Sequence, residues 1–413
     1  MTDKSKHVPQ GYKDSPLGII PKEWEVKRLG DYVAITSGES PSLYDLKVEG
    51  LYPYVKVEDM NNCSKYQIES REYSNDTRNI ILKGSIIFPK RGAAILNNKV
   101  RIAQTNILMD SNMMAITVKK DCLDPEFLYY TIIQEKLYKI ADTSTIPQIN
   151  NKHIIPYRFC LPLINEQKSI VSLLITWDTA IEKQSELIEK LTLRKRALMQ
   201  QLLTGKKRLS GFSREWKRIK LDDIAERVTR KNEEDNKNVV TISAQRGFVV
   251  QTDFFNKSVA SETLDNYFLV HKDEFCYNKS YSNGYPMGAI KRLKTFDEAV
   301  VTTLYICFRL KDKASANIDF FEQYCESGIF NKELVKVANE GGRAHGLLNV
   351  TPSDFFNMHM SIPNIDEQHA IASVLVNADK EIQLANEKLA NLQSQKRGLM
   401  QQLLTGKIRI KIE

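Results

Sequence analysis

The segment LMQQLLTGK at residues 198–206 recurs without change at residues 399–407, an offset of 201. The same offset, without a gap, relates further identical positions: Pro162 and Pro363, Glu166 and Glu367, Gln167 and Gln368, Asp178 and Asp379, Ile181 and Ile382, Lys195 and Lys396, Arg196 and Arg397. Chance does not produce such a run of matches. The repeat decides the fold, because it means that one structural unit occurs twice.

Upstream of the matched segments the correspondence continues but becomes weaker. Glu23 and Trp24 correspond to Glu215 and Trp216 at an offset of 192, and KGSIIFPK at 83–90 can be laid on KDEFCYNK at 272–279. Whole units were therefore duplicated, and their bodies then diverged. We predict five parts: an N-terminal arm (1–19), a first body (20–160), a first matched segment (161–208), a second body (209–361) and a second matched segment (362–413).

The matched segments have the heptad pattern of helices that pair. Steps of four and three residues give a seam over more than four heptads, which is typical of a coiled coil. The predicted seam of the first helix is Ile170, Leu174, Trp177, Ile181, Ile188, Leu191, Leu198 and Leu202, and that of the second is Ile371, Leu375, Ile382, Leu389, Leu392, Leu399 and Leu403.

Each helix should run for about 33 residues, or roughly 50 Å at 1.5 Å per residue. An apolar stripe of that length needs a partner, and antiparallel pairing of the two sister helices would relate the units by an approximate two-fold axis. Lys195 and Lys396 also fall on the seam. Two interpretations stay open: a polar residue that fixes the register, or a lysine whose stem is buried while its charge stays in water. Gly205, followed by cations, is typical of a helix end.

The bodies combine strand-like and helix-like patterns. The first has apolar runs at 79–88 and 113–118 and an amphipathic stretch at 125–141; the second has an apolar run at 300–310 and a helical stretch at 318–338. These patterns predict the α+β class: two mixed α/β bodies with a twisted sheet, separated by two long helices that form an antiparallel coiled coil.

Composition limits the function without identifying it. The 413 residues include 59 Lys and Arg against 51 Asp and Glu, a net charge of +8 that permits an anionic partner but is common without one. No apolar run approaches the ~18 residues of a membrane span, and the first residues lack the layout of a signal peptide, so we expect a cytoplasmic protein. Scattered cysteines and histidines predict no metal site, and the absence of phosphate-loop, dinucleotide and nucleophile-elbow motifs predicts no catalytic site.

Polar loops are the candidate binding residues of the bodies. Lys and Arg suit phosphate contacts, whereas Arg, Asn and Gln can read base edges. Ordinary solvated loops have the same composition, and the divergence of these loops beside matched helices is what favours a binding role. The candidates for DNA contact are Lys56, Lys90, Arg91, Asn97, Asn98, Lys99, Arg101, Gln148 and Asn150 in the first body, and Gln245, Arg246, Lys279, Tyr281, Asn283, Tyr285, Arg343 and His345 in the second.

A retained scaffold with divergent loops indicates two heads that hold one kind of partner in the same way but recognise different features. A two-fold scaffold also suits duplex DNA, whose backbone has its own two-fold symmetry. A helix pair of roughly 50 Å would span about 15 base pairs at ~3.4 Å per step, an upper limit on the separation of two half-sites.

The sequence resembles the specificity subunit of type I restriction-modification enzymes. The resemblance rests on IPKEWEVKRLGDYV at 20–33, LYPYVKVEDM at 51–60, KGSIIFPKRG at 83–92, the EQ pairs at 166–167 and 367–368, and the duplicated LLTGK ends. TISAQRGFVV at 241–250 does not match LYPYVKVEDM, which weakens any transfer of residue roles into the second body.

The resemblance implies a non-catalytic subunit whose two target recognition domains bind a bipartite, asymmetric DNA site. It also implies that the helices dock two modification subunits, which bind S-adenosylmethionine, and that restriction subunits using ATP and Mg²⁺ join through them. The alternative is a coiled-coil scaffold whose heads bind protein partners. A self-sufficient enzyme would need a cofactor or metal site that the sequence does not offer.

Overall fold

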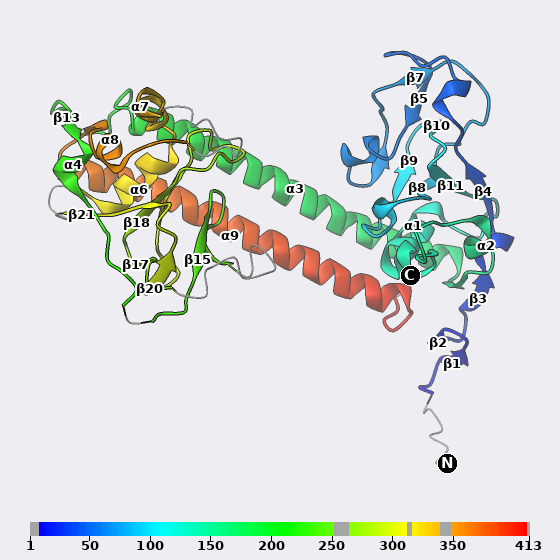
Figure 1. Ribbon diagram of the computed structural model, residues 1–413. Helices are drawn as coiled ribbons and strands as arrows, with labels where there is room; N and C mark the ends of the chain where they lie inside the picture. Colours follow the sequence, from blue (N-terminus) through cyan, green and yellow to red (C-terminus); the bar gives the residue numbers. More distant parts are fainter. Residues whose placement is uncertain (1–7, 234, 252–263, 312–315, 339–347, 411–413) are drawn as a thin grey trace. The chain divides into compact units, whose positions relative to one another are not determined.

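The computed structural model describes residues 8–233, 235–251, 264–311, 316–338 and 348–410. The chain divides into two compact units, which Figure 1 shows with their elements labelled. Unit 1 contains Met1–Gln184 and Lys388–Glu413, and unit 2 contains Ser185–Glu387. This division follows packing and cuts both long helices, so the five-part division of the sequence stays a prediction.

Unit 1 is built around a five-stranded sheet. The order of its strands is β4-β11-β8-β9-β6, and β11 runs antiparallel to both β4 and β8. Its elements are β1 (Tyr12–Ser15), β2 (Gly18–Pro21), β3 (Glu25–Arg28), β4 (Val33–Ser37), β5 (Tyr52–Val55), β6 (Tyr66–Gln67), β7 (Tyr73–Ser74), β8 (Ile86–Pro89), β9 (Arg101–Ala103), β10 (Leu108–Met109), β11 (Met113–Val118), α1 (Pro125–Glu135), α2 (Asn151–Ile154) and β12 (Arg158–Leu161).

Unit 2 repeats this arrangement with fewer strands. Its main sheet has the order β14-β21-β18-β19, and β13 pairs with β22 as β3 pairs with β12 in unit 1. Its elements are β13 (Lys217–Lys220), α4 (Leu221–Ile224), β14 (Ala225–Arg227), β15 (Val240–Ser243), β16 (Gly247–Val250), β17 (Phe268–His271), β18 (Phe275–Asn278), β19 (Ala289–Arg292), β20 (Glu298–Val301), β21 (Ile306–Leu310), α6 (Ile318–Glu326), α7 (Asn331–Val337), α8 (Pro352–Phe356) and β22 (His359–Ile362).

The two main sheets are copies of one another. β8 lies in KGSIIFPK and β18 in KDEFCYNK, and each strand is flanked by its equivalents on both sides. The weak alignment of these segments is therefore correct. The structure confirms α+β bodies that arose by duplication.

Two predicted helical stretches are shorter in the structure. The stretch at 318–338 is broken into α6 and α7, because Gly328 between them has φ +74° and leaves the helical conformation. The stretch at 125–141 ends as an α-helix at Glu135, since the next residue, Lys136, has φ +66°. An apolar period alone does not show such breaks.

The long helices are α3 (Ile164–Leu202) and α9 (Ile365–Leu404), with 39 and 40 residues. Both exceed the predicted 33 residues because the EQ segments form the first helical turn. The side-chain Nε2 of Gln167 donates to the Pro162 carbonyl at 2.8 Å, and the Nε2 of Gln368 donates to the Pro363 carbonyl at 3.0 Å. Gly205, with φ +68°, follows the end of α3 as predicted, and Gly406, with φ +70°, follows the end of α9 in the same way.

Each unit packs the start of one long helix against the end of the other. In unit 1, Ile170 and Leu174 share a core with Leu403, and in unit 2 Ile371 and Leu375 share a core with Leu202. These six seam residues are buried, and the other nine predicted seam residues are half-buried: Trp177, Ile181, Ile188, Leu191, Leu198, Ile382, Leu389, Leu392 and Leu399. None of the fifteen is exposed, which agrees with an apolar contact stripe on both helices.

None of the helices in the described ranges combines the length and the apolar composition needed to cross a bilayer.

Removing a seam side chain should destabilise unit 2. Leu375 is fully buried, so Leu375→Ala should lower the free energy of unfolding by about 2–5 kcal/mol. Leu384 on the same helix is 65% exposed, and Leu384→Ala should change it by less than about 0.5 kcal/mol. Urea unfolding followed by circular dichroism measures both; equal effects would contradict the observed packing.

Candidate nucleic-acid interface

Two polar loops of unit 1 are joined by backbone hydrogen bonds. Residues 90–100, between β8 and β9, lie beside the loop that precedes α2. The amide of Gly92 donates to the Pro147 carbonyl at 2.9 Å, the amide of Ile149 donates to the Lys90 carbonyl at 2.9 Å, and Arg91 forms an isolated β-bridge with Gln148. The structure therefore brings together two of the predicted DNA-contacting segments.

Several side chains of this loop pair are available for a ligand. Arg91, Asn97 and Asn150 are exposed and Gln148 is half-buried; within the described residues their side-chain amide and guanidinium nitrogens donate to no protein group. Lys90 is half-buried, and burial lowers the pKa of its ammonium, with a further decrease from neighbouring Arg91. The pair thus presents two adjacent cations beside amide groups.

Four predicted residues of unit 1 make contacts within the fold instead. Arg101 donates to the carbonyls of Cys63, Val100 and Met60 at 2.8–2.9 Å. The amide of Asn98 donates to Ile133 and accepts from the backbone of Leu137. Lys99 donates to Asn61 at 2.7 Å and Lys56 forms an ion pair with Glu72. We leave Lys56, Asn98, Lys99 and Arg101 out of the proposed DNA-contacting set, because their donors are already engaged.

In unit 2 the loop between β18 and β19, the counterpart of residues 90–100, is joined to the turn between β15 and β16. The Gln245 amide, in the turn between β15 and β16, donates to the Asn283 carbonyl at 2.9 Å. Tyr281 is 64% exposed, and Arg246 and Asn283 are exposed. Lys279 is half-buried and burial lowers the pKa of its ammonium. The loops of unit 2 therefore offer a phenol and an amide beside two cations, Arg246 and Lys279, that come from different loops, whereas Lys90 and Arg91 of unit 1 are neighbours in the sequence.

Tyr285, a further predicted DNA-contacting residue of unit 2, makes contacts within the fold instead. Its hydroxyl donates to Glu326 at 2.8 Å and accepts from Lys291 at 3.1 Å, so we leave it out of the proposed set. Arg343 and His345 lie outside the described residues.

A three-way junction fixes the body of unit 1 to the long helices. Asp178 of α3 forms an ion pair with Lys396 of α9, and its other oxygen accepts a hydrogen bond from Tyr130 of α1 at 2.5 Å. In unit 1 the junction also includes Lys65, whose Nζ lies 2.6 Å from Glu126, 2.8 Å from the Tyr130 hydroxyl and 3.7 Å from Asp178. Burial, followed by Asp178, raises the pKa of Tyr130.

Unit 2 contains the equivalent junction. Asp379 of α9 accepts from Lys195 of α3 at 2.5 Å and from the Gln323 amide of α6 at 2.7 Å. The 201-residue offset relates the pair Asp178–Lys396 to the pair Asp379–Lys195. Each long helix therefore supplies the carboxylate of one pair and the lysine of the other. Both lysine side chains are only 16–17% exposed, which favours the interpretation that they fix the register.

A second repeated contact lies where each helix begins. Glu367 is fully buried and accepts two hydrogen bonds from Arg208, both at 2.6 Å. Glu166 is 1% exposed and accepts two from Arg409, at 2.5 and 3.0 Å. Glu166 also accepts from the Trp24 indole at 2.9 Å. The Trp216 indole nitrogen, its equivalent in unit 2, is buried without a partner in the described residues.

The glycine of each LLTGK end completes this contact. A Cβ on Gly406 would lie 2.4 Å from Pro21 and 3.3 Å from Trp24, and one on Gly205 would lie 3.5 Å from Trp216. Both glycines also have positive φ. The matched LLTGK, EW and EQ motifs therefore meet in space, a role that sequence reasoning missed although the offset of 201 marked most of these positions.

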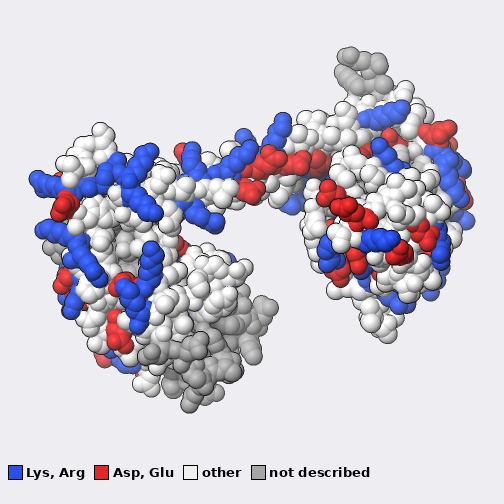
Figure 2. Space-filling model, turned by 90° about the horizontal axis from the view of Figure 1, so that it is seen from above, with Lys and Arg blue, Asp and Glu red and all other residues white. Residues whose placement is uncertain are grey.

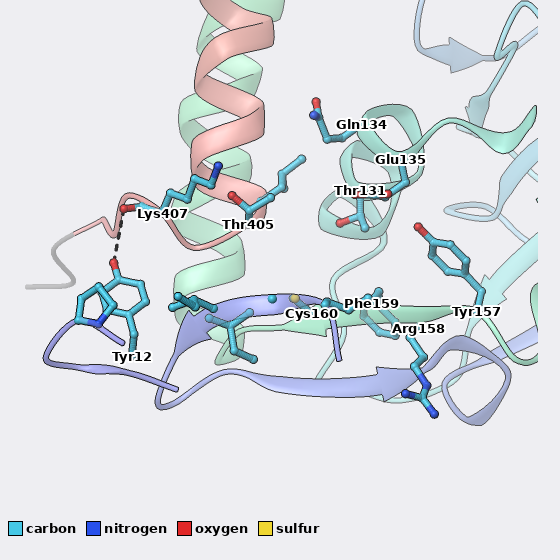
Figure 3. A pocket seen from close by; sticks show the side chains of 16 residues that line it. Tyr12, Thr131, Gln134, Glu135, Tyr157, Arg158, Phe159, Cys160, Thr405 and Lys407 are labelled. Carbon is cyan, nitrogen blue, oxygen red and sulfur yellow. Dashed lines mark hydrogen bonds between the residues drawn. The ribbon is translucent and has the colours of Figure 1, made fainter. Parts of the chain in front are cut away.

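A cavity of about 850 Å³ in unit 1 shows no catalytic arrangement (Figure 3). Thr131, Gln134 and Glu135 of α1 lie across from Thr405 and Lys407 after α9, and the Tyr12 hydroxyl donates to the Lys407 carbonyl at 3.4 Å. Among its lining residues, all of them described, no nucleophile is hydrogen-bonded to a base. No group of three metal-ligating side chains occurs in the described ranges either.

Breaking the Arg208–Glu367 pair should cost more than breaking Arg409–Glu166. Arg208→Met leaves a buried carboxylate without a cation and should lower the free energy of unfolding by about 3 kcal/mol or more. Arg409→Met leaves Glu166 its hydrogen bond from Trp24, so we expect a smaller loss. The double change Arg208→Met with Glu367→Met should regain part of the stability. Thermal unfolding of the three variants measures this order, and a larger loss for Arg409→Met would contradict it.

Comparisons with known proteins agree with this repeated architecture. The model of the type I restriction modification DNA specificity domain matches the chain twice, over residues 21–193 and 213–394. The MjaVIII type I restriction enzyme specificity subunit of Methanocaldococcus jannaschii is 23% identical over 436 residues, 95% of this chain and 94% of that protein. The MjaIX specificity subunit of the same organism is 30% identical over 199 residues, 44% of this chain and 45% of that protein.

Two solved structures share the fold. The type I S subunit of M. genitalium superposes with a TM-score of 0.53 at 15% identity, covering 94% of this chain and 97% of that one. A chain from a structure reported to explain complex assembly and conformational transition of the type I R-M system gives a TM-score of 0.57 at 14% identity, covering 94% and 99%.

The two matched ranges cover most of the sequence, and they coincide with the two copies of the sheet and its helix junction. The resemblance noted from the sequence motifs is thereby confirmed. The chain belongs to the type I restriction-modification DNA specificity family and is a specificity (S) subunit, which serves DNA target recognition.

Proposed function

We propose that the chain recognises one bipartite, asymmetric DNA target, with each body contacting one half-site. The observation that carries the proposal is the contrast within the duplication. Both units keep the same sheet order and the same ion-paired junction, whereas the loops on the sheets differ in charge and chemistry. Two bodies held alike but with unlike loops suit a target made of two unlike halves.

The available groups of unit 1 suit one half-site. Lys90 and Arg91 are adjacent cations that can contact phosphates, and the guanidinium of Arg91 can also bind guanine through its two acceptors. Asn97 and Gln148 carry amides that can read adenine, whereas the side chain of Asn150 caps the start of α2 and has only its nitrogen left to donate. Gln148 lies directly across the bridge from Arg91, so a phosphate contact and a base contact could be made side by side.

The available groups of unit 2 suit a different half-site. Gln245 is tied to the loop that carries Tyr281 and Asn283, and Lys279 begins the same loop. An exposed tyrosine contacts sugar, phosphate or a thymine methyl, while amides read base edges. Lys279 and the exposed Arg246 can contact phosphates, so the loops of this body differ from those of the first mainly by the exposed tyrosine.

The paired helices would separate the half-sites and dock two modification subunits. On this proposal the chain itself is non-catalytic: S-adenosylmethionine would bind to the modification subunits, and ATP and Mg²⁺ to restriction subunits that join through them. Work on cellular DNA would place the chain in the cytoplasm. A scaffold whose heads bind proteins would instead show no salt-dependent affinity for duplex DNA.

The loops of unit 1 should determine only one half of the target. Arg91→Ala together with Gln148→Ala should weaken binding about 10- to 100-fold and relax the base preference at one half-site, since a good side chain–base contact is worth about 1–3 kcal/mol. A methylation map made with the modification subunit reads both half-sites. Loss of preference at both halves would contradict the two-body model, and Thr143→Ala with Thr145→Ala, two exposed positions nearby, serve as control.

Lengthening the helices should lengthen the gap. Seven residues inserted after Glu186 and seven after Glu387, which the offset of 201 relates, preserve both heptad seams and add roughly 10 Å to each helix. The unread gap should then increase by about three base pairs at ~3.4 Å per step. Insertion into one helix alone is the control, because it offsets the Asp–Lys pairs and should impair folding. An unchanged gap in the double insertion would show that the helices do not set it.

A further inference from the structure

Residues 206–216, which we call the linker because they lead from α3 to β13, are together with β13 far more basic than the equivalent part of unit 1. Residues 206–220 (KKRLSGFSREWKRIK) contain seven Lys and Arg and one Glu. The equivalent residues 14–28 (DSPLGIIPKEWEVKR) contain three basic and three acidic residues, and the tail after α9 adds Lys407 and Arg409 within the described residues. The repeat holds the scaffold constant, so this difference is not required by the fold.

Most of these cations are exposed and lack an ion pair in the described residues. Arg208 pairs with Glu367, and on the adjacent α7 Lys336 pairs with Glu333. The remaining cations form what we call the basic face: Lys206, Lys207, Arg214, Lys217, Arg218, Lys220 and Lys332, all exposed. Figure 2 shows Lys and Arg gathered on the visible side of this unit.

Few carboxylates lie close to the basic face. Glu215 is in the same segment, and Asp223 accepts from the backbone amide of Lys220 at 2.7 Å. α7 lies beside β13 and β22. Glu333 of α7 accepts a hydrogen bond from the backbone amide of His359 in β22, and Lys336, with a further contribution from Arg218 in β13, lowers the pKa of Glu333. β13 and α7 therefore lie next to one another, and the linker runs directly into β13, so the three segments together carry a large excess of positive charge.

The scaffold explains only part of this charge. Lys206 and Lys207 follow the C-terminus of α3, where cations favour the helix dipole. Lys217, Arg218 and Lys220 are on a strand, and their equivalents in unit 1 are Glu25, Val26 and Arg28. In unit 1 the two glutamates of this segment are neutralised locally, Glu25 by Lys27 at 2.7 Å and Glu23 by Arg409 at 2.8 Å.

We propose that the basic face of unit 2 binds the phosphate backbone of duplex DNA outside the base-reading loops. Cations spread over a strand, a linker and a helix suit a polymer with closely spaced negative charges better than a single phosphate group. The face is dominated by lysine and arginine, and the amide beside it, Asn357, already accepts from Lys220 at 3.2 Å. This composition favours contacts that do not depend on sequence. This inference rests on the proposed DNA-binding function and adds a second, non-specific contact to one unit only.

Salt dependence of DNA binding tests the proposal. The test variant combines Lys207→Gln, Arg214→Gln, Lys217→Gln and Arg218→Gln in the full chain, and the probe is a fluorescent 40-base-pair duplex of random sequence. Each lost phosphate contact lowers the slope of log affinity against log salt by about 0.9. The unmodified chain should therefore lose about 100-fold more affinity than the variant between 50 and 200 mM salt.

A matched variant removes the same charge elsewhere. Lys183→Gln, Lys190→Gln, Lys380→Gln and Lys388→Gln change four exposed lysines of the long helices and should leave the slope almost unchanged. Equal slopes for the unmodified chain and the test variant would overturn the proposal, as would an equal decrease in the matched variant. Should the fourfold variant not fold, Lys217→Gln with Arg218→Gln should give about half the decrease.

Two further outcomes separate this inference from the function on which it rests. An unmodified chain without any salt-dependent affinity for DNA would contradict the proposed function itself. A test variant that keeps its DNA slope but no longer assembles with the modification subunit would assign the basic face to an acidic protein surface, and this inference would be wrong.

Discussion

The buried carboxylates at the start of the two long helices are the constraint on which the rest of the structure depends. Glu166 and Glu367 are almost completely inaccessible to water, and a carboxylate in such a place is tolerated only with a cation and further donors. In each unit the cation comes from the arginine after the other helix, Arg409 or Arg208. Each helix can therefore begin only where its sister ends, and this requirement brings the first and last parts of the chain into one unit.

The junctions at Asp178 and Asp379 attach the bodies to the long helices, again through a carboxylate that accepts from two parts of the chain. One oxygen of each aspartate accepts a hydrogen bond from a lysine of the sister helix. The other oxygen accepts from a helix of the body, through Tyr130 of α1 in unit 1 or Gln323 of α6 in unit 2. A body is thus tied to both long helices through a single carboxylate. Reciprocal contacts of this kind are expected of an isologous interface, here formed within one chain. Because these contacts do not involve the exposed side chains of the loops, those side chains can change without disturbing the attachment.

The sequence predicted the duplication, the α+β bodies and the seam residues, because identity at a fixed offset and apolar period are local features of the chain. Asp178 and Lys396 were visible as members of the repeat, but their pairing was not, since it joins residues 218 positions apart. The same limit applies to the loops. Arg91 and Arg101 are the same residue type in one loop region. The Arg101 guanidinium donates to the carbonyls of Met60, Cys63 and Val100, whereas the Arg91 guanidinium donates to no protein group in the part of the chain that the structure describes. Only the folded chain separates a structural cation from an available one.

The departures from symmetry carry more information about recognition than the symmetry does. Unit 1 adds Lys65 to its junction and Trp24 to its buried glutamate, whereas in unit 2 the Trp216 indole nitrogen is buried without a partner among the described residues. The linker and β13 of unit 2 instead carry several exposed cations that form no ion pair with a described residue. Because a common ancestor gave both units one scaffold, neither difference is needed for folding. An asymmetric target would be served by such a division, in which one body gains precision from a firmly held loop pair and the other gains affinity from backbone phosphates.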